Sequence, residues 1–140
     1  MPESKYGKCI KTGELIKEIP HYTGKSVLAH KGELETDCSI GYHCISKPIT
    51  FDIPHSHNFA EMLCFFGGDA RDVTDLGAEV EMTLGGEKHL ITTAAVVSIP
   101  PKLKHCPIVI KNVRKPLVFL EISLTRIWKP GRRPRKKPAQ

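Results

Sequence analysis

His55-Ser-His57-Asn-Phe-Ala-Glu61 is the most informative stretch of this 140-residue chain, and Pro100-Pro-Lys-Leu-Lys-His105 adds to it further downstream. On an extended segment, side chains two apart project to the same face, so His55 and His57 can point to one spot and Glu61 can join them from the next pleat. Imidazole and carboxylate groups are ligands of iron, manganese, nickel, copper and zinc. The segment therefore offers a metal chelate, with His105 as a fourth donor. The alternative is that the two histidines lie on a half-exposed strand and never meet the other two residues.

The residues around the histidines add order to this pattern. Pro54 precedes the first histidine, Glu61 is the fourth residue after His57, and Gly67-Gly68 ends the segment. This order resembles the first motif of the cupin superfamily, G(X)5HXH(X)3-4E(X)6G, in which His55, His57, Glu61 and Gly68 match in spacing.

The second cupin motif, G(X)5PXG(X)2H(X)3N, is matched by Pro100 and His105 at the correct separation. Four positions of the two motifs depart from the usual glycine or asparagine, namely Ile49, Ala94, Lys102 and Val109. The metal ligands are all present, so these departures bear on turn conformation and on the lining of the pocket.

The resemblance implies an all-β fold, the double-stranded β-helix or jelly-roll barrel of cupins. It brings His105 to the barrel mouth beside His55, His57 and Glu61, which together would hold a divalent transition metal (Fe, Mn, Ni, Cu or Zn). Alternation along the strand then directs Leu63 and Phe65 inward with Glu61, as pocket-lining residues. Met62 and Cys64 would face the other way.

Short runs rich in β-branched and aromatic residues, separated by turn residues, favour the same fold class. A short helix is predicted over residues 10–19, with Thr12 as its cap and Pro20 as its end. Gly85-Gly86 predicts a two-residue hairpin.

Residues 67–77, with three aspartates, are interpreted as a solvated loop or lid. Strands are expected at residues 26–29, 39–45, 49–53, 60–66, 79–84, 88–92, 96–99, 107–111 and 117–124.

The chemistry of such a site stays open between several reactions. An iron(II) centre could bind substrate and dioxygen side by side, whereas a redox-inert ion could only polarise a carbonyl or activate water. We therefore expect a metal-binding cupin acting on or binding a small polar organic molecule, with dioxygenase chemistry slightly favoured. A metal-dependent isomerase or lyase and a non-catalytic ligand-binding or sensor module are the alternatives. No catalytic residue is assigned, and both Tyr42 and His43 are compatible with facing the cavity.

Charge is concentrated at the C-terminal end. Of 21 lysines and arginines, six lie within residues 129–137, and the other 15 are balanced by 15 acidic residues. We divide the chain into an N-terminal arm (1–25), a cupin barrel (26–128) and a basic tail (129–140). The tail could contact nucleic acid or an anionic surface, but a solubilising extension or a strap across a partner subunit is favoured.

The remaining features indicate a soluble, cytoplasmic protein. Five widely spaced cysteines without a CxxC pair predict reduced thiols rather than a disulfide framework. No apolar run reaches the length of a membrane span, and the first residues lack the pattern of a signal peptide. The resemblance also implies a homodimer formed through the sheets.

Overall fold

The computed structural model describes residues 4–130, and these residues form ten strands and two single-turn 3-10 helices. The 3-10 helices are η1 (Gly7–Cys9) and η2 (Gly13–Leu15). The strands are β1 (Ile16–Glu18), β2 (Lys25–Ala29), β3 (Ser39–Ile45), β4 (Ile49–Phe51), β5 (Glu61–Gly67), β6 (Asp75–Leu84), β7 (Glu87–Thr93), β8 (Ala95–Ile99), β9 (His105–Lys111) and β10 (Leu117–Ser123).

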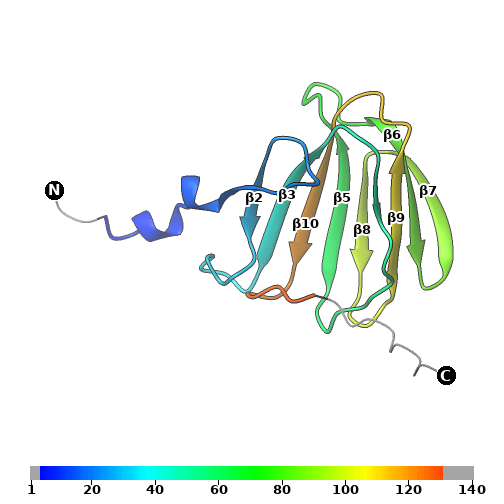
Figure 1. Cartoon of the computed structure of the whole chain (residues 1–140). Coiled ribbons are helices and arrows are strands. Elements are labelled where there is room, and N and C mark those ends of the chain that lie inside the picture. Colours follow the sequence, from blue (N-terminus) through cyan, green and yellow to red (C-terminus); the bar gives the residue numbers. More distant parts are fainter. Residues whose placement is uncertain (1–3, 131–140) are drawn as a thin grey trace.

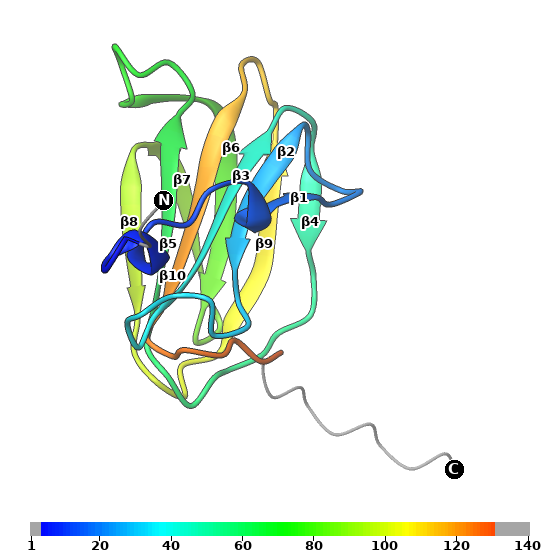
Figure 2. The same ribbon diagram turned by 90° about the vertical axis from the view of Figure 1, so that its left-hand side faces the viewer.

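The strands form two antiparallel sheets that enclose the interior, and Figure 2 shows them from the side. The larger sheet has the order β1-β2-β3-β10-β5-β8, and the smaller has the order β4-β9-β6-β7. Sequence neighbours such as β3 and β4 lie in different sheets, whereas β10 lies between β3 and β5. This confirms the predicted all-β, jelly-roll architecture.

Register divides the inner face of the larger sheet into layers. At the end of the barrel where β5 begins and β10 ends (bottom of Figure 1), Glu61 is paired with Ser123. One layer further in, Leu63 is paired with Glu121, and the layer after that pairs Phe65 with Phe119. The side chains on this face therefore change from polar at one end to aromatic in the middle of the barrel.

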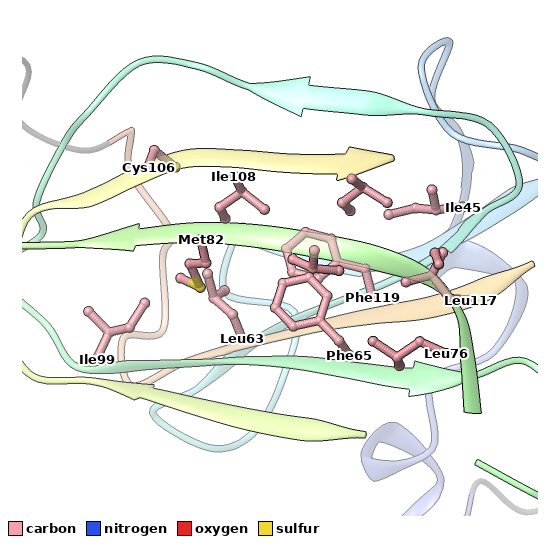
Figure 3. Close-up of a cluster of buried hydrophobic side chains, with 13 residues drawn as sticks. Ile45, Leu63, Phe65, Leu76, Met82, Ile99, Cys106, Ile108, Leu117 and Phe119 are labelled. Atoms are coloured by element: carbon pink, nitrogen blue, oxygen red, sulfur yellow. The ribbon is translucent and has the colours of Figure 1, made fainter. Parts of the chain in front are cut away.

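The hydrophobic core fills the deeper layers between the two sheets (Figure 3). Phe65 and Phe119 stack there with ring centroids 5.1 Å apart. Leu76, Met82 and Leu117 are completely buried around them. Burying large side chains in this way stabilises the fold by about 1.5–3 kcal/mol each, and it leaves the polar end of the barrel free for function.

Three expectations about local structure need correction. The helix predicted over residues 10–19 is wrong: the chain makes two 3-10 turns and then β1, which pairs with β2. Glu14 accepts the Thr12 backbone N–H, which ties the chain into a local turn, and Leu15 is the only buried residue of the two turns. A single buried residue gives no apolar face on which a helix could pack.

The predicted loop at residues 67–77 is too long, because β6 already begins at Asp75. Leu76 is buried in the core, and Gly77 at φ 64° allows an irregular start to the strand. A third difference is that β4 ends at Phe51 rather than at residue 53. The other predicted strands are present with shifts of one or two residues at their ends, apart from β6.

The Gly85-Gly86 hairpin between β6 and β7 is present, with φ values of 55° and 84°. No helix among residues 4–130 is long and apolar enough to cross a bilayer. Beyond Lys129 and Pro130, the basic tail lies outside the described residues.

Candidate metal centre

The three motif histidines meet at the polar end of the barrel. His105 begins β9, and His55 lies in the loop that follows β4. The two residues form an isolated bridge, in which each backbone N–H donates to the carbonyl of the other at 3.1 and 2.9 Å. With His57, they present ring nitrogens that all lie within 4.8 Å of one another. Folding thus brings together residues about fifty positions apart in sequence.

The backbone fixes the tautomer of two of these rings. The Nδ1 of His55 lies 2.8 Å from the Ile53 carbonyl, and that of His105 lies 3.1 Å from the Leu103 carbonyl. Because a carbonyl only accepts hydrogen bonds, Nδ1 carries the proton in both rings. A metal ligand bond from either ring would therefore come from Nε2, the arrangement in which metal-ligating histidines are commonly held.

Glu61 contributes a carboxylate to the same cluster from the first position of β5. Its Oε1 lies 2.9 Å from His105 Nε2 and 3.5 Å from His57 Nε2, and its Oε2 accepts a 3.1 Å hydrogen bond from the Ser123 hydroxyl. Burial alone would raise the pKa of this carboxyl, but the neighbouring imidazoles and the hydroxyl outweigh burial and lower the pKa. For His57, burial lowers the pKa of the imidazole despite the nearby Glu61.

The contact between His105 and Glu61 distinguishes this cluster from an ordinary buried ion pair. Both side chains are almost completely buried, and yet His105 Nε2 has no hydrogen-bond partner among the described residues. An imidazole lone pair and a carboxylate oxygen 2.9 Å apart repel each other unless a cation, either a proton on Nε2 or a metal ion, lies between them. The donor set of three imidazoles and one carboxylate fits a divalent transition metal.

Comparison with solved structures identifies the fold. A cupin-2 domain from Rhodospirillum rubrum is 12% identical at a TM-score of 0.54, with 86% of this chain and 72% of that chain covered. An RmlC-like cupin from Shewanella frigidimarina is 16% identical at a TM-score of 0.51, with 83% and 90% covered. The chain has the cupin fold.

A third similar structure shows that the fold does not carry the activity with it. Peruvianin-I, described as a cysteine peptidase from Thevetia peruviana latex, is 10% identical at a TM-score of 0.59, with 88% of this chain and 76% of that chain covered. No family model matches the sequence, and no curated protein matches it significantly. The function of this protein must therefore be argued from its own site.

The cluster of the three histidines and Glu61 opens into a cavity of about 600 Å³, a size typical of small-molecule sites. Leu63 lines this cavity on β5, with Phe119 and Ile108 among the other apolar wall residues. Phe65 also points inward, but it lies one layer deeper, is completely buried and belongs to the core rather than to the cavity wall.

A second polar group lies in the same cavity; the sequence left open whether Tyr42 or His43 faces inward, and it did not point to Glu121. His43 faces inward and is 2% exposed, whereas its neighbour Tyr42 faces outward and is 41% exposed. His43 Nδ1 is 2.8 Å from the Ser26 hydroxyl, and its Nε2 is 2.8 Å from Glu121 Oε1. Tyr22 stacks on the imidazole at a centroid distance of 3.9 Å, and burial raises the pKa of its hydroxyl.

None of the five cysteines forms a disulfide, as predicted. Cys106 lies beside His105 and lines the cavity, where burial and the nearby Glu61 raise the pKa of its thiol to about 12. Burial also raises the pKa of Cys64. Both thiols are therefore protonated and poorly nucleophilic at neutral pH.

Proposed function

We propose that this cupin holds a divalent transition metal through His55, His57, His105 and Glu61, and that it acts on a small organic molecule in the adjoining cavity. The observation that carries the proposal is the buried, unpartnered His105 Nε2 beside the Glu61 carboxylate. A proton on Nε2 would satisfy this pair alone, whereas a metal ion also satisfies the His55 and His57 nitrogens that converge on the same spot.

Among the possible reactions we favour dioxygenase chemistry. Iron(II), when bound by such a donor set, supplies open positions for a substrate and for dioxygen. The protein orients the ligands through backbone hydrogen bonds from His55 and His105, and it surrounds the site with apolar walls such as Leu63 and Phe119. These walls exclude water from part of the cavity and favour a substrate with an apolar body.

An isomerase or lyase is the second candidate, because one observation favours it. Such reactions require a group that moves a proton near the metal-bound substrate. The hydrogen-bonded pair of His43 and Glu121 lines the same cavity as the metal ligands. A non-catalytic binding module is the third candidate, in which the same pair would only contact the ligand.

Metal analysis and oxygen uptake test the proposal. The protein purified without added metal or chelator should contain close to one equivalent of a transition metal, and iron should confer oxygen uptake with a suitable small substrate. Tightly bound zinc with no oxygen uptake would turn the proposal toward isomerase or lyase chemistry. Absence of metal after exposure to each of Fe(II), Mn(II), Ni(II), Cu(II) and Zn(II) would contradict it.

We also propose that two copies pair through the outer face of the larger sheet. The register places a continuous set of mostly apolar side chains on this face of the three central strands β3, β10 and β5. Light scattering coupled to gel filtration should give twice the chain mass, and Leu120→Glu should convert the dimer to a monomer. The residues concerned are the exposed Tyr42, the buried Cys64 and the half-buried Ile40, Cys44, Met62, Phe66, Val118, Leu120 and Ile122.

A further inference from the structure

Glu121 occupies the cavity wall one layer inward from the metal cluster. It is paired with Leu63 on β5, while Glu61 is paired with Ser123, so the two glutamates are diagonal neighbours on the inner face of adjacent strands. Diagonal neighbours of this kind have backbone positions about 7–8 Å apart. One small molecule can therefore contact the metal and Glu121 at the same time.

The carboxylate of Glu121 is held by a fixed chain of hydrogen bonds. With the Ser26 hydroxyl donating to His43 Nδ1, the His43 Nε2–H donates to Glu121 Oε1 at 2.8 Å. The stacked Tyr22 ring fixes the plane of the imidazole. Among the described residues, only Oε1 of this carboxylate has a hydrogen-bond partner, so the group keeps capacity to accept another donor.

The space in front of this carboxylate is kept open by Gly41. A Cβ atom at this position would lie 3.0 Å from both Glu121 Oε1 and His43 Nε2, and 3.4 Å from His30 Nε2. Gly41 does not adopt a positive φ, so its backbone conformation does not require glycine. The missing side chain instead leaves room where three polar groups converge.

The charges around the cavity indicate what this space accepts. Its described lining contains the carboxylates of Glu61, Glu121 and Asp52, and none of the described lining residues is Lys or Arg. Near Glu121, a second acidic group on a ligand would thus meet a carboxylate and no lysine or arginine among the described residues, and burial lowers the pKa of the nearby His30, which favours its neutral form. A hydroxyl or ammonium group would instead complete the hydrogen bonding of Glu121.

We propose that Glu121, positioned by His43, receives a hydroxyl or ammonium group of the ligand whose oxygen at the other end binds the metal. This inference deepens the proposed function and rests on it for the metal-bound end of the ligand. It gives the ligand class: a small molecule with an apolar body, a metal-binding oxygen group at one end and a hydrogen-bond donor at the other.

Calorimetric titration of the Co(II)-loaded protein tests this with probes matched in length. For four-, five- and six-carbon chains, the ω-amino and ω-hydroxy carboxylates are compared with the simple carboxylate and the dicarboxylate. At the best length, one of the donor-bearing probes should bind at least about tenfold more tightly than the simple carboxylate, and the dicarboxylate should bind most weakly. The amino and hydroxy series distinguish the two kinds of donor.

Two variants test whether Glu121 causes the preference for donor-bearing probes over the simple carboxylate. Glu121→Gln should reduce it to about twofold or less while leaving the simple carboxylate unaffected, because the amide keeps the shape but loses the charge. The matched control Glu87→Gln, at an exposed glutamate of β7, should keep the full preference. Equal binding of all probes at every length, tightest binding of a dicarboxylate, or an unchanged preference in Glu121→Gln would overturn the inference.

A metal-free titration separates this inference from the proposed function. Hexylammonium should bind the metal-free wild-type protein, and the affinity should fall about tenfold in Glu121→Gln. If Co(II) fails to bind but hexylammonium depends on Glu121, the metal proposal fails and the role of Glu121 stands. If Co(II) binds, and Glu121→Gln changes neither the probe preference nor hexylammonium binding, the metal proposal stands and the role of Glu121 fails.

Discussion

The two polar ends of the cavity differ in how the sequence encodes them. The end that we propose to bind a metal, called the metal end below, is formed by His55, His57 and Glu61 within seven residues, closed by His105. The Glu121 end joins side chains from three strands and has no motif; His43 and Glu121 are 78 positions apart. Metal chemistry requires fixed donors at fixed spacing, whereas recognition of a particular ligand requires only that register place suitable groups on one wall. The metal end can therefore be predicted from the sequence, whereas the Glu121 end becomes visible only in the folded structure.

Removing a metal ligand should have the largest effect and should break the metal end alone. His105→Ala deletes one donor and leaves Glu61 without its 2.9 Å neighbour. Metal affinity should fall by well over the ~10–100-fold that loss of an outer-shell partner costs, as measured by metal titration. His89→Ala, at an exposed histidine of β7, is the matched control and should bind metal normally. Equal metal content in both variants would show that the cluster is not the metal site.

Ser123→Ala tests whether metal binding depends on the hydrogen bond that orients Glu61. The Ser123 hydroxyl donates to Glu61 Oε2 and orients the carboxylate toward the histidines. Its loss should weaken metal binding by ~10–100-fold. Ser39→Ala is a close control, because Ser39 is equally buried, is paired with Ser123 in the sheet and has no hydrogen-bond partner for its hydroxyl among the described residues. A similar loss of affinity in both variants would indicate a general effect on the sheet.

Gly41→Ala should damage the Glu121 end and leave the metal end intact. The added methyl group would contact the Glu121 carboxylate and the His43 ring at about 3.0 Å, so these groups must shift. We expect metal affinity to be unchanged and binding of the best donor-bearing probe to fall by about tenfold, equivalent to about 1.4 kcal/mol. Gly13→Ala, where a Cβ atom would meet nothing within 4 Å, should change neither quantity. Loss of metal in Gly41→Ala would show that the two ends are not separable.

The sequence predicted the fold, and it pointed to the histidines that the fold brings together, because both follow from local patterns. Strand alternation and turn residues located most strands, and the motif spacing located the ligands. It could not predict the Glu121 end, since only the pairing of Glu121 with Gly41 and Leu63 brings these residues to one layer. It also placed Phe65 in the pocket, because alternation gives the face of a strand but not the depth at which aromatic packing closes the core.

The smallest expected effect concerns protein stability, and it comes from one departure from the cupin motifs, in the turn that precedes His105. Lys102 replaces a glycine that is usual in the second motif, and it keeps a positive φ of 71°. Its backbone N–H donates to the His57 carbonyl at 2.7 Å, so the turn links the two ligand segments. A non-glycine residue in this conformation destabilises the folded state by about 1–2 kcal/mol. Replacement by glycine removes this strain, but part of the gain is lost because glycine increases the entropy of the unfolded chain.

Lys102→Gly should therefore raise the free energy of unfolding by up to about 1 kcal/mol, measured by chemical denaturation. Lys104→Gly, two residues later in the same turn, should lower it by about 0.5–1 kcal/mol, because Lys104 is not among the positive-φ residues and glycine there only adds unfolded-state entropy. Opposite signs for one substitution at two neighbouring sites would attribute the effect to backbone conformation, since both variants lose the same charge. If both variants were destabilised, Lys102 would not be strained, and the usual glycine at this position would have to serve close packing instead.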